Sequence, residues 1–432
     1  LSDCPFVSRC PLGDASCSGA LPELTPIGNP GHFSACVHHD AAVDGDELWP
    51  SVEHGVGDDP ELPDHPTVAI EDLKVHFPVH RGGRRNRKTA VRAVDGVTLD
   101  VYAGRTLGVV GESGCGKSTL GLTLVGLNEM TEGSVTVEGQ PLDASSGRHR
   151  RTIQMIFQDP FSSMNPGMRV GDIIAEPLRI HKIGSSDERA AKAVALLERV
   201  GLTAEDAQRH PHEFSGGQRQ RIAIARALAA DPKVIVCDEP VSALDVSVQA
   251  QIVNLLRETQ LETGVALIFI AHDLAVVRHV SHEIAVMYLG QVVEKAGRDL
   301  IYGDPLHPYT KALLAAVPVP DPESGVDLKP SLEGDLPDPA DPPPGCRFHT
   351  RCPVAVEGLC DKTEPQLTEI EAGRWVSCHL VDSPLDLPTA PDLSRNRDAP
   401  SEPSRNGNQS QTEIDKDRMQ EETTETLDGR PQ

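Results

Sequence analysis

The run Gly111-Glu-Ser-Gly-Cys-Gly-Lys-Ser118 directly follows the apolar segment 106–110 and leads into a helical segment that starts at Thr119. Its glycines let backbone N–H groups turn inward around phosphate oxygens, and the start of the helix adds favourable partial charge. Lys117 can reach the outer phosphates, and Ser118 can bind magnesium. A glycine-rich turn that binds nothing is the alternative. The strand and helix on either side favour a phosphate-binding loop, formed by Gly111, Glu112, Ser113, Gly114, Cys115, Gly116, Lys117, Ser118 and Thr119.

A second apolar segment, Val234-Ile-Val-Cys-Asp-Glu-Pro240, ends in two carboxylates. In the sheet of a phosphate-loop protein, Asp238 would lie on the metal side, and Glu239 would accept the proton of the attacking water. Two acids at the end of a strand would by themselves indicate only a solvated loop. Together with the loop at residues 111–118, they predict nucleotide hydrolysis.

Short runs rich in Val and Ile alternate with helical stretches between residues 67 and 300. The runs include 106–110, 234–237 and 266–270, and the helical stretches include 190–200 and 218–230. This alternation predicts an α/β fold with a mainly parallel sheet covered by helices.

The run Phe214-Ser-Gly-Gly-Gln-Arg-Gln-Arg221 resembles the signature motif of the ABC ATPase family. The resemblance implies a P-loop cassette with a mainly parallel sheet, an antiparallel β subdomain and a helical subdomain. It also implies that Ser215, Gly216, Gly217 and Gln218 bind the γ-phosphate of an ATP held by a second ATPase subunit. A Ser-Gly-Gly helix start does present N–H donors to an anion, although a capped helix without a ligand would look the same.

Other elements of the ABC family occur in the expected order. Gln158 resembles the Q-loop residue, residues 242–245 the D-loop, and His272 the switch histidine. The family implies that Gln158 helps Ser118 and Asp238 to hold magnesium, and that His272 bridges the γ-phosphate and the attacking water. Phe77 is the best-placed candidate to stack on adenine, and a core phenylalanine is the alternative.

Two further runs are similar to those of oligopeptide and dipeptide importer ATPases: Pro305-Leu-His-Pro-Tyr-Thr-Lys-Ala-Leu-Leu314 and Gln158-Asp-Pro-Phe-Ser-Ser-Met-Asn-Pro166. The resemblance implies a peripheral subunit on the cytoplasmic face of the cell membrane. Its partners would be two membrane permease subunits, fed by an extracellular solute-binding protein. Peptides are the expected cargo, although relatives that import nickel or some sugars have similar ATPases.

Four cysteines gather near the C-terminus, at Cys346, Cys352, Cys360 and Cys378. Lasting disulfides are disfavoured in the cytosol, where ATP is used. Four thiolates suit an iron–sulfur cluster or structural zinc, although the spacing lacks the paired C-x2-C knuckles common in zinc sites. Similar tails in peptide-importer ATPases imply a 4Fe-4S cluster. Zinc and thiols without a metal are the alternatives.

The N-terminus repeats this pattern with Cys4, Cys10, Cys17 and Cys36, and Arg9-Cys-Pro11 echoes Arg351-Cys-Pro353. We interpret residues 1–40 as the end of an upstream ATPase copy, so that the second ATPase would be fused to this one and these cysteines could bind a second metal. An accidental cysteine-rich leader is the alternative. The first residue is Leu1, which agrees with a start inside a longer product.

Charge separates the remaining classes of function. Asp plus Glu number 65 against 40 Lys plus Arg, which gives a net charge of −25 and disfavours nucleic acid as a partner. This counts against the main rival, a soluble ABC ATPase of translation or DNA repair. Apolar runs such as 265–271 are far shorter than the roughly 20 residues of a membrane-spanning helix.

Composition predicts five parts along the chain. They are a Cys-rich segment at 1–40, an acidic linker at 41–66, the ATPase domain at 67–304, a peptide-importer type extension at 305–382, and a disordered polar tail at 383–432.

Overall fold

The computed structural model describes residues 4–7, 10, 12–19, 21–27, 33–38, 62–79, 89–143, 147–316 and 334–381. The tail expected at 383–432 and most of the linker expected at 41–66 lie outside these residues. The described segments before residue 39 contain the 3-10 helix η2 (Ala15–Cys17) and the short antiparallel strands β1 (Thr25–Pro26) and β2 (Phe33–Ser34).

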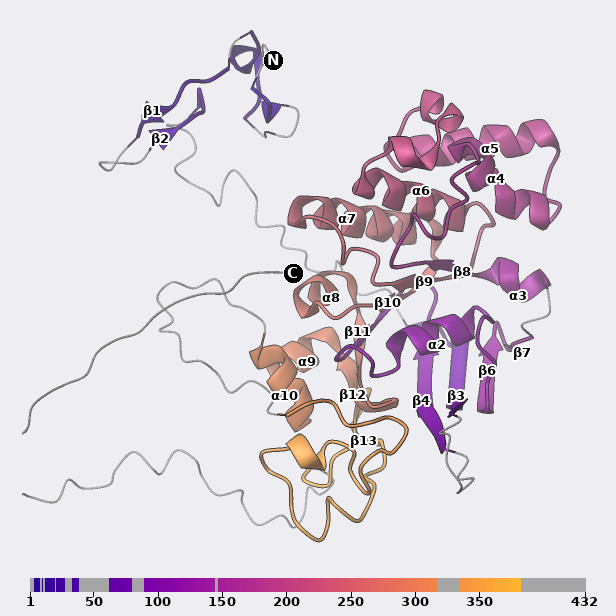
Figure 1. Cartoon of the computed structure of the whole chain (residues 1–432), viewed down its shortest axis with the longest axis vertical. Coiled ribbons are helices and arrows are strands. Elements are labelled where there is room, and N and C mark those ends of the chain that lie inside the picture. Colours follow the sequence, from indigo (N-terminus) through magenta and orange to yellow (C-terminus); the bar gives the residue numbers. More distant parts are fainter. Residues whose placement is uncertain are drawn as a thin grey trace, which may run out of the picture. The chain divides into compact units, whose positions relative to one another are not determined.

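A large sheet organises the described part of the cassette, with its strands in the order β13-β14-β12-β11-β5-β10-β9-β8. Figure 1 labels β12, β11, β10, β9 and β8 of this sheet. The five strands from β11 to β8 run parallel, and the strands on the other side are antiparallel to their neighbours. The parallel strands are β5 (Thr106–Val110), β8 (Ile153–Ile156), β9 (Val234–Asp238), β10 (Ala266–Ile270) and β11 (Glu283–Tyr288). The predicted runs at 106–110 and 266–270 are therefore strands, and the run at 234–237 extends by one residue.

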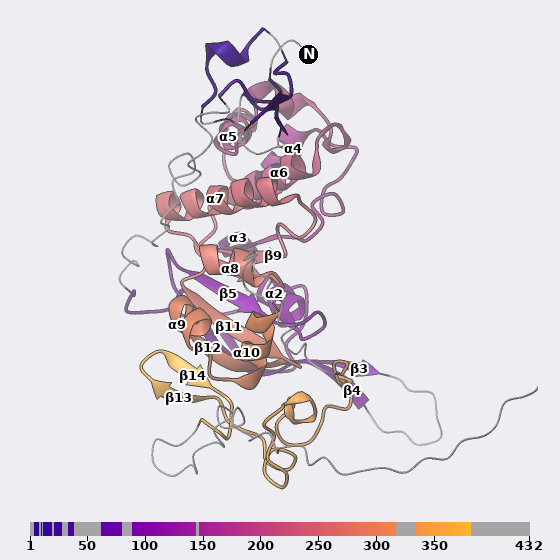
Figure 2. The same cartoon turned by 90° about the vertical axis from the view of Figure 1, so that its left-hand side faces the viewer.

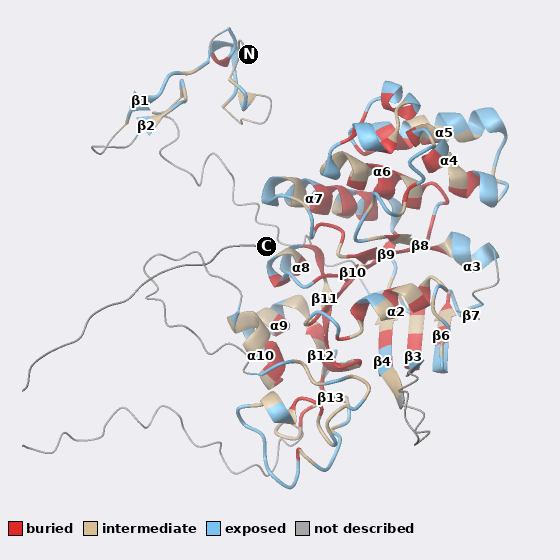
Figure 3. Cartoon of the chain, in the orientation of Figure 1, coloured by how far each residue is buried: buried red, intermediate tan, exposed pale blue. Residues whose placement is uncertain are grey.

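The strands β5, β9 and β10 are buried on both faces because side chains alternate along them and both faces are covered (Figure 3). In β10, Leu267 and Phe269 belong to the core shared with the helical subdomain, whereas Ile268 and Ile270 belong to the core under the antiparallel sheet. This double burial explains why these strands read as continuous apolar runs.

The second sheet is antiparallel, in the order β4-β3-β6-β7, and forms the β subdomain that the family resemblance implies. The strand-like sequence after residue 67 becomes one long strand, β3 (Val68–Val79), which pairs with β4 (Thr89–Val101). The other strands are β6 (Glu132–Val137) and β7 (Gln140–Pro141). Helix α2 (Lys117–Leu124) shares the apolar core of this sheet through Leu120 and Leu124.

The helical subdomain consists of α4 (Val170–Ile180), which packs against α5 (Ser186–Arg199) and α6 (Gly216–Leu228). Figure 2 shows these helices together on the far side of α7 (Val246–Thr263) from the central strands. Short helices complete the cassette: α3 (Gly147–Thr152), η4 (Ala204–Gln208), η5 (Pro211–Glu213) and α8 (Leu274–Val280). In the described parts of the chain, no helix combines the length and apolarity needed to cross a bilayer.

The C-terminal extension joins the cassette through the main sheet. Strand β14 (Arg374–Val376) pairs with β12 (Gln291–Gly297) and with β13 (Thr368–Glu371). Helix α9 (Arg298–Gly303) leads into the extension, which also contains α10 (Pro308–Ala315) and η6 (His349–Arg351). Phe348 of the extension is buried edge-to-face against Tyr288, at 5.2 Å between ring centroids. The extension is therefore joined to the ATPase domain by backbone hydrogen bonds of the main sheet and by a common apolar core.

Candidate active site

The phosphate loop connects the buried strand β5 to helix α2, as its sequence predicts. Gly116 has φ +110°, and a Cβ placed there would lie 2.0 Å from the carbonyl oxygen of Ala93. Gly111 has φ +150°, and its Cβ would lie 2.2 Å from the carbonyl oxygen of Met287. Both positions require glycine because a side chain would collide with neighbouring backbone.

Lys117 is the first residue of α2 and is buried, with 5 % of its surface exposed. Its Nζ donates to the carbonyl oxygens of Gly111, at 2.7 Å, and of Glu112, at 2.9 Å. The ammonium is therefore held over the loop by the loop's own backbone. An ammonium in this place can neutralise phosphate oxygens bound to the loop.

The expected magnesium ligands converge from two elements. Ser118 of α2 donates through Oγ to Oδ1 of Asp238 at the end of β9, 2.9 Å away. Burial raises the pKa of Asp238, the Glu239 charge raises it further, and the Ser118 hydrogen bond and Lys117 oppose the rise. A hydroxyl and a carboxylate oxygen at this separation form a donor set of the type that Mg²⁺ prefers.

Glu239 is the point at which the predicted catalytic side chains meet. Its Oε2 accepts from Nε2 of Gln158 at 2.9 Å, and its Oε1 lies 3.2 Å from Nδ1 of His272. Glu239 has φ +45°, and its backbone N–H donates to the carbonyl oxygen of Ile270 on the neighbouring strand. The turn that follows β9 thus places an acidic side chain beside Gln158 and His272.

A cavity of about 310 Å³ lies between the phosphate loop and β4. It is bounded by Phe77, Val91, Ala93, Ser113, Gly114, Gly116, Lys117, Ser118, Thr119, Glu239 and Pro339. Phe77 is 41 % exposed, which leaves its ring accessible for stacking on a base. Among the described residues that line this cavity, none belongs to the signature motif.

The signature motif forms the start of helix α6. Ser215 is its N-cap and accepts at Oγ from the backbone N–H of Gln218, while Ser215 N–H donates to Gln218 Oε1 at 3.0 Å. This reciprocal pair closes the helix start and leaves Gly216 and Gly217 in its first turn. A helix start of this kind binds anions, so the motif can serve an ATP other than the one on its own phosphate loop.

The structure also connects the phosphate loop to residues that the sequence did not identify as part of the site. Arg351 donates to both carboxylate oxygens of Glu112, at 2.6 and 2.9 Å, and Tyr309 OH accepts from Glu112 N–H at 2.9 Å. Glu112 is therefore directed to the extension, and it does not line the cavity. The one available signal was Arg351 itself, which stands in the repeated Arg-Cys-Pro sequence.

The four C-terminal cysteines are neighbours in space. Burial raises the pKa of Cys346, and the nearby thiols of Cys360 and Cys352 raise it further. Burial also raises the pKa of Cys352, and the nearby thiols of Cys378 and Cys360 add to this rise. Backbone N–H groups point at the sulfurs, as in the 3.4 Å contact from Val356 N to Cys360 Sγ. None of these four described cysteines forms a disulfide. Clustered thiols with N–H donors form a donor set that fits a metal group.

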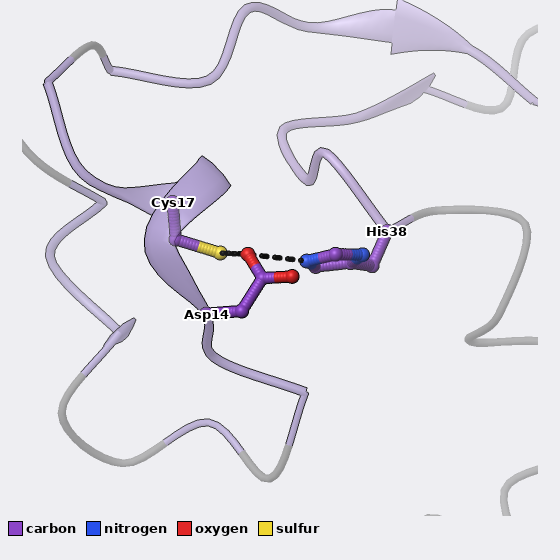
Figure 4. A group of neighbouring side chains, drawn as sticks. All are labelled: Asp14, Cys17 and His38. Atoms are coloured by element: carbon purple, nitrogen blue, oxygen red, sulfur yellow. Dashed lines mark hydrogen bonds and ion pairs between the residues drawn. The ribbon is translucent and has the colours of Figure 1, made fainter.

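The N-terminal cysteines are arranged differently. Within the described residues, the three metal-ligating side chains whose donor atoms lie within 4.8 Å of one another are Asp14, Cys17 and His38 (Figure 4). Cys4, Cys10 and Cys36 are not part of this group. Asp14 is the N-cap of η2, and its side chain accepts from Ser16 N–H at 2.8 Å. Hydrogen bonds from Ser16 lower the pKa of Asp14 to about 2, and His38 makes a smaller contribution. Helix capping alone accounts for the position of Asp14.

Comparison with known proteins agrees with this geometry. A family profile described as ABC transporter matches residues 94–242, and one described as oligopeptide/dipeptide transporter, C-terminal region, matches residues 293–360. The chain is 54% identical over 325 residues to the oligopeptide transport ATP-binding protein of Salmonella typhimurium, across 73% of this chain and 96% of that protein. It is 47% identical over 321 residues to the dipeptide transport ATP-binding protein of Escherichia coli, across 73% and 95%.

A likeness also exists to a solved structure, that of cbiO1 from Clostridium perfringens, described as part of the ABC transporter complex cbiONQ. The two chains are 25% identical with a TM-score of 0.49, across 56% of this chain and 92% of the other.

The fold and the site define a nucleotide hydrolase with a phosphate loop. The chain belongs to the family of ABC transporter ATP-binding proteins, as the long matches to two of its members show. The predicted cassette fold and ATP hydrolase activity are thereby confirmed.

Proposed function

We propose that this chain is the ATP-hydrolysing subunit of an importer for oligopeptides or dipeptides. The observation that carries the proposal is the C-terminal extension, which matches the C-terminal region of oligopeptide/dipeptide transporters and is built into the cassette through the β12–β14 ladder. The relatives reported above are named for oligopeptide and dipeptide transport. Translation or DNA repair has no comparable support.

The proposed reaction assigns one task to each side chain that gathers at Glu239. Glu239 accepts the proton of the attacking water, and Gln158 and His272 orient the carboxylate and the water. Lys117 neutralises the outer phosphates from its place over the loop. Ser118, Asp238 and Gln158 would hold magnesium, which would neutralise phosphate charge when bound.

A second ATPase completes the proposed site. The signature motif does not line the cavity at the phosphate loop of its own chain, so Ser215, Gly216 and Gly217 would bind the ATP of a partner. That partner is a separate chain or an upstream copy in the same product. The repeated cysteine spacing at residues 4–36 and 346–378 supports the upstream copy.

Two permease subunits are the proposed membrane partners, and they would place the chain on the cytoplasmic face of the membrane. A groove of about 600 Å³ runs beside Gln154 and Met155 of β8 and is bordered by α4 and α6. Leu127 and Ile180 on its rim are 63 % and 65 % exposed. Exposed aliphatic side chains around a groove are typical of a protein interaction site. Phe157, the sequence neighbour of Gln158, lines this groove, so permease contact there would be linked to hydrolysis.

The four C-terminal cysteines are proposed to bind a 4Fe-4S cluster, with zinc as the alternative. The mutual proximity of Cys346, Cys352 and Cys360 and the N–H donor to the Cys360 sulfur support a thiolate site. Zinc would be held by the same four thiolates, with Zn–S bonds of about 2.3 Å.

Reconstitution tests the proposed function. The full chain, its ATPase partner and two permeases would be placed in liposomes with the binding protein, and peptide uptake would be measured together with phosphate release. We expect both rates to rise with ATP and with a di- or oligopeptide, and uptake to stop with Glu239→Gln. Association with ribosomes or DNA instead of permeases in a pull-down would contradict the transport role.

A further inference from the structure

Glu112 is the second residue of the phosphate loop and the acidic residue of the run 111–119. A carboxylate in a loop that binds a polyphosphate repels its ligand unless its charge is compensated. Three contacts hold it in place. Its backbone N–H donates to Tyr309 OH at 2.9 Å, its carbonyl accepts from Lys117 Nζ at 2.9 Å, and its carboxylate is bound by Arg351.

The contact with Arg351 has the geometry of a strong ion pair. Nη1 lies 2.6 Å from Oε2 and Nη2 lies 2.9 Å from Oε1, so the guanidinium binds both oxygens side by side. The Arg351 side chain is 5 % exposed and that of Glu112 is 28 % exposed. Removal of one partner from such a pair leaves a partly buried charge without compensation.

Arg351 is itself fixed by the extension. It ends the short helix η6, which begins directly after the buried Phe348. The Phe348 ring packs against Tyr288 and against Tyr309, at 5.2 and 5.4 Å between centroids. The residue that binds the Glu112 carboxylate and the residue that binds its N–H are thus supported by the same aromatic cluster.

We propose that Arg351 is a positioning residue for ATP binding: by neutralising Glu112 and fixing it away from the cavity, it holds the phosphate loop, including the carbonyl that orients Lys117, in the form that accepts nucleotide. The inference rests on ATP use by this family and is independent of the cargo. The extension thereby becomes part of the nucleotide site, although it supplies no catalytic residue there.

The test measures equilibrium binding of a fluorescent ATP analogue, mant-ATP, to the full chain. We expect Arg351→Gln to weaken binding about tenfold, because one uncompensated charge near the phosphates shifts affinity by this order. The double variant Arg351→Gln with Glu112→Gln carries neither charge and should bind within about twofold of the wild type. Arg351→Lys, which keeps the charge and loses the paired geometry, should fall between the two.

Arg374→Gln is the matched control. Arg374 is also in the extension, is also 5 % exposed, and pairs at 3.1 Å with Asp304, which is not part of the phosphate loop. It should lower thermal stability while leaving mant-ATP affinity unchanged. If Arg351→Gln does not fold, the mant-ATP affinity of the double variant tests the proposal.

Two results would overturn the proposal. The first is wild-type affinity in a folded Arg351→Gln variant. The second is a folded double variant that binds tenfold more weakly than the wild type. A wild-type chain that fails to bind mant-ATP would overturn the proposed function as well, so the two failures are distinguishable.

Discussion

Nε2 of Gln158 donates to Oε2 of Glu239 across 2.9 Å, which joins the segment after β8 to the turn after β9. The two residues are far apart in sequence and come from neighbouring parallel strands. A movement of the Gln158 segment therefore acts directly on the carboxylate that we assign as general base. This contact would give the proposed permease docking a physical route to the hydrolytic site.

Glu239→Gln tests the assignment of the base. The amide keeps the size of the side chain but cannot accept the proton of water, so phosphate release should fall by at least about 100-fold. Binding of mant-ATP should stay within a few-fold of the wild type because the phosphate loop is unchanged. Hydrolysis close to the wild-type rate would show that another group acts as the base.

Ser215→Ala tests the signature helix, with Ser185→Ala as its control. Both serines are N-caps with capping boxes, and each accepts a backbone N–H at 3.3 Å, in α6 and α5 respectively. Each substitution should reduce the free energy of unfolding by about 1 kcal/mol. ATPase activity should fall only for Ser215→Ala, and an equal fall for both would assign the loss to stability alone.

Burial of His307 should make the free energy of unfolding sensitive to acid. Burial lowers its pKa from 6.5 to about 3, and its Nδ1 accepts from Tyr309 N–H at 3.0 Å, while Glu294 accepts its backbone N–H. Below pH 6.5 the unfolded chain binds a proton that folded His307 does not, so the free energy of unfolding falls as the pH drops towards 3.

The variant His307→Asn keeps a cap acceptor for Tyr309 N–H and removes the titration. The stability advantage of the wild type over this variant should shrink with falling pH, by at most about 1.4 kcal/mol per unit. Urea unfolding at pH 7.5, 6 and 5 measures it. An advantage that stays constant across this range would mean that His307 has the same pKa in the folded chain as in the unfolded chain.

Cys378→Ser tests the proposed cluster. Chain purified without oxygen should contain iron and sulfide and show the broad visible absorbance of an iron–sulfur centre, and the variant should lose both. Cys237→Ser is the control because Cys237 is buried in β9 and is not one of the four clustered thiols. Stoichiometric zinc without iron in the wild type would show that these cysteines bind zinc and not an iron–sulfur cluster.

The sequence predicted those parts of the site that local chemistry determines. Gly116 and Gly111 mark a loop that only glycine can form, and the apolar runs at β5, β9 and β10 identify strands buried on both faces. Glu239 could be found because it directly follows one of those strands. These features depend on residues close together along the chain.

Contacts between distant segments were not predictable. Arg351 and Glu112 are separated by 239 positions, and no local pattern of charge indicates that they pair. The group of Asp14, Cys17 and His38 was missed for a related reason, since spacing drew attention to cysteines while capping of η2 determines the position of Asp14. Signals of this kind appear only when the chain is folded.

The pairing of β14 with β12 has a consequence for the integrity of the protein. Val292, Val293 and Glu294 of β12 are buried. Pairing with β14 provides hydrogen-bond partners for backbone N–H and C=O groups that would be unpaired if β12 were an edge strand. Truncation after Asp304 would remove β14 and leave β12 as an exposed apolar edge strand, with which strands of other molecules could pair. By covering β12, the extension would also protect the cassette against aggregation.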